Sequence, residues 1–189
     1  MLLDQFQTIG RELSSRGLVT SHSGNLSVRF GERMVITRRG SMLGCLTEQD
    51  LIETGISRND RNTPLASSEL PVHRAIYQST NAQAIVHAHP PYATAFSIAE
   101  HEIVPKDEWY DVIGKVPVLG WGQNLKPGCL DEEVARELKD RRVVMLYGHG
   151  SFSIGQLLEE AFSFTTVLEE AAKVLCLLKS ISSDKNPQG

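Results

Sequence analysis

The sequence lacks the features that would place it outside the class of ordinary globular domains. It holds three cysteines, Cys45, Cys129 and Cys176, which are odd in number and far apart, so neither a CxxC motif nor a disulfide framework is expected. No stretch approaches the roughly 18 apolar residues of a membrane span, and the first residues show no signal peptide. These absences predict a cytoplasmic protein with reduced thiols and no membrane partner.

A basic excess is also missing. The chain has 19 Lys and Arg against 23 Asp and Glu, a formal charge of −4 with neutral histidines. This balance does not suit broad contact with a phosphate backbone, so no nucleic-acid partner is expected. No internal repeat or low-complexity segment is visible. The 189 residues therefore predict one domain over 1–181 and a polar C-terminal tail over 182–189.

Hydrophobic periodicity predicts a mixture of helices and strands. Helical spacing is expected over 2–13, 67–77, 92–99, 131–139 and 157–178, and the second of these helices is expected to begin with a serine cap. β-prone runs occupy 26–30, 34–37, 84–89, 143–147 and 151–154. The section 100–125 is rich in proline and glycine and predicts loops with one or two short strands. This order predicts an α/β or α+β domain with helices covering a sheet.

Three histidines are candidate metal ligands. His87 and His89 flank one alanine at the end of an apolar run, and residues i and i+2 of a strand face the same side. Both imidazoles can then converge on one cation at about 2.0–2.1 Å. His149 lies between two glycines, which allow close backbone approach, at the end of the strongest β-run. The alternative is a structural role, in which buried imidazoles meet polar partners and His149 sits in a tight turn.

A carboxylate and three polar turns complete the candidate site. Glu69 is either an acid that stabilises a helix N-terminus or a base beside a metal. Backbone N–H, hydroxyl and guanidinium groups of short polar turns are suitable ligands for an anion. Such turns lie at 23–25, 37–41 and 67–68, and each is also compatible with an ordinary turn.

Taken in order, five motifs resemble the class II aldolase/adducin family. They are SGNLSVR at 23–29, ITRRG at 36–40, SSE at 67–69, HAH at 87–89 and GHG at 148–150. The resemblance runs from about residue 2 to residue 180. It implies a three-layer α/β/α sandwich around a largely antiparallel central sheet. It also implies a homotetramer with sites at the subunit interfaces.

The resemblance implies a role for each matching residue. A divalent metal, usually zinc, is implied on His87, His89 and His149, with Glu69 near it as the general base. Phosphate contacts are implied for Gly24, Asn25, Ser67 and Ser68, and the second turn places Arg39 and Gly40 in the matching stretch.

Two positions need separate comment. Relatives commonly carry a hydroxyl residue where this chain has Arg39, which either holds a phosphate more strongly or selects a carboxylate. The family also uses a tyrosine that donates a proton across the subunit interface. Tyr110 is near the corresponding place, and Glu108 is its rival for that role.

The implied activity is that of a metal-dependent lyase. It cleaves a small ketose 1-phosphate by a retro-aldol reaction into dihydroxyacetone phosphate and an aldehyde, and a metal suits the enediolate that this cleavage produces. The expected partner is therefore a small phosphorylated sugar. Epimerases, dehydratases and decarboxylases of sugar phosphates or sugar acids use the same metal triad and stay open as alternatives. A non-catalytic, adducin-like interaction module is a further alternative.

Overall fold

The computed structural model describes residues 2–120 and 129–184. Its strands are β1 (Asn25–Phe30), β2 (Arg33–Thr37), β3 (Leu51–Gly55), β4 (Ala84–Ala88), β5 (Glu102–Ile103), β6 (Val116–Leu119), β7 (Val143–Leu146) and β8 (Ser151–Gly155). They form one eight-stranded sheet in the order β3-β2-β1-β4-β8-β7-β6-β5. Neighbouring strands are antiparallel except β6 and β7, which run parallel. The sheet is therefore largely antiparallel, as expected.

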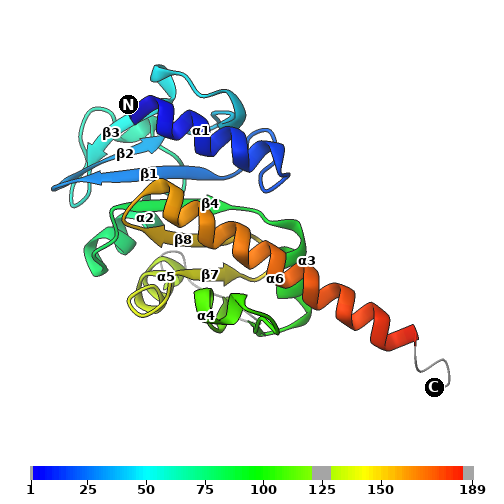
Figure 1. Cartoon of the computed structure of the whole chain (residues 1–189). Helices are drawn as coiled ribbons and strands as arrows, with labels where there is room; N and C mark the ends of the chain where they lie inside the picture. Colours follow the sequence, from blue (N-terminus) through cyan, green and yellow to red (C-terminus); the bar gives the residue numbers. More distant parts are fainter. Residues whose placement is uncertain (1, 121–128, 185–189) are drawn as a thin grey trace.

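Helices cover both faces of this sheet. They are α1 (Leu2–Ser15), α2 (Leu70–Ser79), α3 (Pro91–Ala99), α4 (Trp109–Ile113), α5 (Cys129–Glu137) and α6 (Leu158–Asp184). Apolar side chains of α2 and α5 pack on one face, and those of α1, α3, α4 and α6 pack on the other. In Figure 1, α1 and α6 cross in front of the sheet while α2 and α5 lie behind it. The three-layer α/β/α sandwich is thus confirmed. Among residues 2–120 and 129–184, none of the helices combines the length and the hydropathy that a membrane span requires.

The alternation of side chains along β4 decides which layer holds the candidate site. Every residue of this strand is buried, between β1 on one side and β8 on the other. Val86 packs into the layer of α1 and α6, whereas Ile85 packs into the layer of α2 and α5. His87 lies two residues after Ile85 and so faces α2.

Several segments differ from their prediction. The strand β3 and the five-residue helix α4 were not expected. The last helix continues to Asp184, beyond the predicted start of the tail at Ser182, and 185–189 lie outside the described residues, as does the 121–125 part of the predicted loop section.

The predicted serine cap of α2 is also wrong. The residue before α2 is Glu69, and its side chain makes no capping hydrogen bond. The Ser67 hydroxyl instead accepts a hydrogen bond from the Glu69 N–H, at 3.2 Å, in the turn that precedes the helix. A tight turn closed by the Leu70 N–H and the Ser67 carbonyl, 3.1 Å apart, therefore precedes the helix. This turn holds Glu69 at the start of α2.

Candidate metal centre and anion cavity

Three histidine side chains meet where β4 and β7 end and β8 begins. The ring centroids of His87 and His89 are 4.8 Å apart, those of His89 and His149 are 4.9 Å apart, and those of His87 and His149 are 5.3 Å apart. One candidate ligand atom from each ring lies within 4.8 Å of the other two. The structure therefore brings together the three residues that the sequence predicts as metal ligands.

The environment of His87 fixes which of its nitrogens is available. Its Nδ1 lies 2.9 Å from the Ser151 carbonyl oxygen on β8, and because a carbonyl only accepts, Nδ1–H is the donor. Burial, and then the neighbouring His89 and His149, lower the pKa of His87 well below its usual value. The ring is therefore neutral at physiological pH, and Nε2 carries the lone pair that a metal needs.

The other two histidines are held by backbone contacts. The N–H of His89 donates to the Leu18 carbonyl at 2.7 Å, and burial followed by the nearby His149 lowers the pKa of His89. His149 is exposed in the turn between β7 and β8. Gly150 lets this turn approach β4, since a Cβ there would lie 2.4 Å from the Ala88 carbonyl oxygen. Three imidazoles with these constraints fit a divalent cation, which takes neutral nitrogen ligands.

Glu69 lines the same cavity as the three histidines, which has a volume of about 170 Å³. Its side chain is half-buried. Burial raises the pKa of Glu69 above its ordinary 4.5, while His149 opposes this shift and Asp131 adds to it. A carboxyl group whose pKa moves toward neutrality is suited to exchanging a proton with a bound molecule.

The three predicted anion-binding turns also line this cavity. Its walls include Gly24, Asn25, Arg38, Arg39, Gly40, Ser67 and Ser68. Backbone hydrogen bonds from Arg39 N–H to the Leu65 carbonyl (3.0 Å) and from Ser67 N–H to the Thr37 carbonyl (3.1 Å) bring the second and third turns together.

The first turn reaches the cavity because of Gly24. This residue has a φ of +77°, and a Cβ there would lie 2.9 Å from the His87 carbonyl oxygen. A side chain is excluded at this position for both reasons. The turn therefore lies directly against the end of β4.

The charges of this cavity favour an anion. Arg38 and Arg39 are exposed, and neither guanidinium makes a hydrogen bond or ion pair with residues 2–120 or 129–184. The helix α2 begins directly after Glu69, which lines this cavity, and the partial positive charge of the helix N-terminus favours negative ligands. Glu69 is the one acid that lines the cavity in the described part of the chain.

One predicted site residue lies elsewhere. Tyr110 is exposed on α4, as is its rival Glu108 just before the helix, and neither lines the histidine cavity of the same protomer. Conversely, Ser23 and Arg38 line the cavity without having been singled out, although both belong to the predicted turns. His22 lines it too.

Asp131 is a neighbour of the site that no sequence pattern indicated. It lines an adjoining cavity of about 360 Å³ together with Glu69 and His149. Burial, followed by the nearby Glu132, raises the pKa of Asp131. Its position at the start of α5 looks like that of any acid in a first helical turn, so its proximity to Glu69 depends on the tertiary fold.

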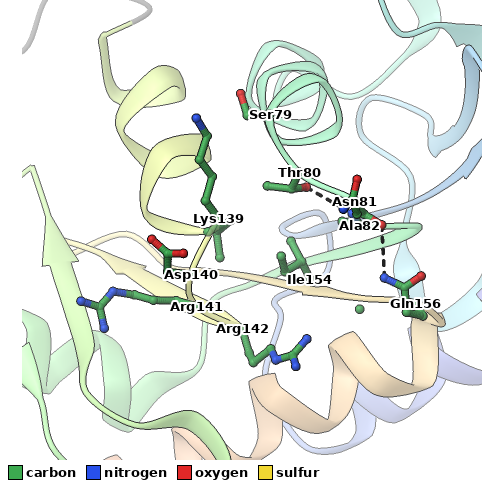
Figure 2. Close-up of a pocket in the computed structure, with 12 residues that line it drawn as sticks. Ser79, Thr80, Asn81, Ala82, Lys139, Asp140, Arg141, Arg142, Ile154 and Gln156 are labelled. Atoms are coloured by element: carbon green, nitrogen blue, oxygen red, sulfur yellow. Dashed lines mark hydrogen bonds between the residues drawn. The ribbon is translucent and has the colours of Figure 1, made fainter.

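A larger cavity, of about 520 Å³, lies at the other end of β4 and β8 from the three histidines. It is lined by the residues after α2 and α5, and its cations are Lys139, Arg141 and Arg142. Figure 2 shows these three side chains pointing in different directions. Arg141 binds Glu137 and the Lys115 carbonyl, so it is already paired. This cavity offers no convergent set of groups, and the histidine cavity is the better candidate site.

Comparison with known proteins identifies the family and agrees with the fold. The family model described as "Class II Aldolase and Adducin N-terminal domain" matches residues 4–176. An L-fuculose phosphate aldolase of Methanococcus maripaludis is 32% identical over 188 residues, which cover 96% of this chain and 99% of the relative. A 3-oxo-tetronate 4-phosphate decarboxylase of Haemophilus influenzae is 32% identical over 183 residues, which cover 90% of this chain and 85% of the relative.

A solved structure is similar over the same extent. The crystal structure of L-fuculose-1-phosphate aldolase from Thermus thermophilus has a TM-score of 0.88 and 33% identity, and the match covers 100% of this chain and 98% of that one. Sequence motifs, fold and relatives therefore agree, and the chain belongs to the class II aldolase and adducin family.

Proposed function

We propose that this protein is a metal-dependent lyase that cleaves a small ketose 1-phosphate, similar to L-fuculose 1-phosphate, into dihydroxyacetone phosphate and an aldehyde. One observation carries the proposal. A single cavity combines three clustered imidazoles, one half-buried carboxyl group and two guanidinium groups that no described residue pairs. This combination suits a substrate that has a metal-binding oxygen pair at one end and a phosphate at the other.

Each part of the cavity has a defined task in this proposal. His87, His89 and His149 hold the divalent ion, which we take to be zinc because its usual ligands include neutral imidazoles. When bound, the ion supplies a positive centre that stabilises negative charge on the substrate oxygens. The backbone and hydroxyl groups of the three turns bind the phosphate, together with Arg39. Two separate points of attachment fix the orientation of the substrate.

Two proton transfers remain after binding. In cleavage, a proton leaves the hydroxyl group on the carbon that becomes the aldehyde, the carbon–carbon bond breaks, and a carbon of the triose phosphate takes a proton. We assign the transfer at carbon to Glu69, whose raised pKa supports this role. The transfer at oxygen is assigned to Tyr110, with Glu108 as the alternative. In cleavage Glu69 therefore gives its proton to carbon and Tyr110 accepts the hydroxyl proton, whereas in condensation Glu69 is the base and Tyr110 the proton donor.

The position of Tyr110 supports a proposal about assembly. Its exposed side chain is not part of the cavity in its own protomer, so its role requires α4 of a second copy. Val112 on the same helix is another exposed apolar side chain that a neighbouring subunit can cover, and Ile98 and Tyr147 are exposed elsewhere on the surface. We therefore propose a homo-oligomer, a tetramer by family resemblance, located in the cytoplasm.

A second candidate is decarboxylation of a phosphorylated 3-oxo acid. The relative from Haemophilus influenzae, named as a decarboxylase, has the same 32% identity to this chain as the named aldolase from Methanococcus maripaludis. Arg39 is compatible with both reactions, since a guanidinium binds a carboxylate as well as a phosphate.

Metal analysis followed by product analysis tests the proposal. We expect roughly one divalent ion per chain, as for a three-histidine site, and release of triose phosphate from ketose 1-phosphates. Release of carbon dioxide from a 3-oxo acid phosphate, without triose phosphate, would establish the decarboxylase instead. A protein that holds no metal after reconstitution would favour the non-catalytic interaction module.

Replacing Arg39 by alanine tests the phosphate end of the cavity. We expect KM for a phosphorylated substrate to rise roughly tenfold or more, the effect of losing one charge-assisted hydrogen bond. KM for the unphosphorylated analogue should change little. The matched control is Arg61→Ala, which removes an exposed arginine outside the cavity. Equal effects of Arg39→Ala on the two substrates would contradict a phosphate contact.

A further inference from the structure

A buried chain of polar side chains links the interior of α2 to the wall of the cavity. The Tyr77 hydroxyl lies 2.8 Å from Ser27 Oγ, and Ser27 Oγ lies 2.6 Å from His73 Nδ1. The other ring nitrogen, His73 Nε2, lies 2.5 Å from Asn25 Oδ1. All four residues are at most 4% exposed. Asn25 is the member of this group that lines the cavity. The cavity wall is therefore connected to three groups that substrate cannot touch.

The local structure explains why these four side chains meet. Asn25 and Ser27 are alternate residues of β1 and face the same side of the sheet. His73 and Tyr77 are four residues apart in α2 and lie on one side of the helix, which packs on that face. Buried polar groups are costly without partners, and the hydrogen bonds among these four side chains give a partner to each of their polar atoms except Asn25 Nδ2.

The Tyr77 end of this hydrogen-bonded series determines the direction of all its hydrogen bonds. Within residues 2–120 and 129–184, Ser27 Oγ is the one hydrogen-bond partner of the buried Tyr77 hydroxyl, which must therefore donate to it. Ser27 has one hydroxyl proton and donates it to His73 Nδ1. The opposite direction would leave the Tyr77 O–H buried without an acceptor.

The same logic sets the tautomer of His73. Burial lowers the pKa of His73 to about 3, so the ring is neutral and carries one proton. Because Nδ1 accepts from Ser27, the proton is on Nε2, and it is donated to Asn25 Oδ1. The amide oxygen of Asn25 is thereby occupied on the protein side.

The amide nitrogen of Asn25 is then left for the cavity. Asn25 Nδ2 makes no hydrogen bond with the described residues. The fully buried side-chain atoms without a partner in this part of the chain are Thr94 Oγ1 and Ser151 Oγ, and Asn25 Nδ2 is not among them. Its two protons therefore open onto the cavity that Asn25 lines.

We propose that Tyr77, Ser27 and His73 are positioning residues that fix the Asn25 amide with its N–H groups toward the cavity, so that this point of the wall selects a hydrogen-bond acceptor such as a phosphate oxygen. The proposal rests on the proposed function for the identity of the acceptor. The direction of the hydrogen bonds from Tyr77 to Asn25, in contrast, depends on these four residues alone. Its consequence is specificity: an ammonium or hydroxyl donor finds no acceptor at Asn25.

Nitrogen NMR of the full-length protein, labelled with ¹⁵N-histidine, tests the direction without any assumption about activity. We expect His73 to be neutral, with its proton on Nε2. In Tyr77→Phe, which keeps the ring but removes the terminal donor, we expect the Nδ1–H tautomer to become populated. Tyr92→Phe, at an exposed tyrosine outside the chain of hydrogen bonds, should leave the His73 signals unchanged. A wild-type proton on Nδ1 would overturn the proposal, and this measurement needs no variant to fold.

Titration with inorganic phosphate tests the consequence at Asn25. We expect Tyr77→Phe to weaken phosphate binding about three- to tenfold, the range of one ordinary hydrogen bond. With an active substrate, KM should rise by the same factor while kcat stays within about twofold. Asn25→Asp should weaken phosphate binding far more, because it turns an oxygen and a negative charge toward the cavity. Unchanged phosphate affinity in Asn25→Asp would overturn the proposal.

The two measurements separate this inference from the proposed function. A protein that binds phosphate as described but cleaves no ketose phosphate would refute the lyase activity and leave the positioning chain intact. A lyase whose phosphate affinity and His73 tautomer are both insensitive to Tyr77→Phe would refute the positioning chain alone.

Discussion

Replacing His149 by alanine is expected to reduce the bound metal from roughly one ion per chain to near zero, because two imidazoles hold a divalent ion far more weakly than three. His149 is the most informative of the three candidates, since it is exposed in a turn and its removal leaves little buried space. The fold should therefore survive the substitution. The measurement is metal content after dialysis, together with the thermal unfolding midpoint with and without a chelator. A chelator should lower this midpoint in the wild type and leave it unchanged in His149→Ala.

His87→Ala serves as a comparison with a different side effect. It should also abolish metal retention, but it additionally removes a fully buried side chain and its hydrogen bond to the Ser151 carbonyl. Losing that hydrogen bond and emptying a fully buried position cost about 1–3 kcal/mol, so the metal-free variant should be less stable than metal-free His149→Ala. His101→Ala, at an exposed histidine outside the cavity, is the control. Full metal content in both His149→Ala and His87→Ala would contradict the metal centre.

The candidate ligands could be found from the sequence because two local rules apply to them. The spacing of His87 and His89 places both on one side of a strand, and the apolar residues before them predict that this strand is buried. The convergence of His149 on this pair is not local. It depends on β8 pairing with β4, which brings the turn at Gly150 against Ala88, and only the order of motifs pointed to it.

Other parts of the fold leave a weaker trace in the sequence. The helix α4 spans five residues, too few for a helical period to appear, and it lies in a section dominated by proline and glycine. The strand β3 alternates over a short run that ends in Gly55, so its pattern is equally compatible with a loop.

Partners far apart in the chain are the least predictable. His73 is four residues after Glu69, which suggests one shared helix face. In the structure Glu69 precedes the helix and reaches the cavity, whereas His73 points inward to Ser27 and Asn25. The spacing determines positions along α2, but packing against β1 decides which side is buried.

Glu69→Gln is expected to keep the bound metal and to lower turnover by about 10²–10⁴-fold, the range typical of a general acid–base group. Glutamine has nearly the same shape as glutamate but cannot take up or release a proton. The histidines should therefore retain their positions while the transfer at carbon fails. The measurement is the rate of triose phosphate release at saturating substrate, on samples of verified metal content.

The pKa of Glu69 gives this variant a second, independent signature in the metal-free protein. Burial raises the folded-state pKa of Glu69 above its ordinary 4.5, so the protein loses stability as the pH rises from 4.5 to the folded-state pKa, and this loss persists at higher pH. The variant lacks this cost, and metal-free Glu69→Gln should be at least as stable as metal-free wild type at neutral pH. Glu170→Gln, at an exposed glutamate on α6, should change neither rate nor stability. Normal turnover in metal-loaded Glu69→Gln would remove Glu69 from the mechanism, because a folded, metal-bound site would then be working without its only cavity carboxylate in the described part of the chain.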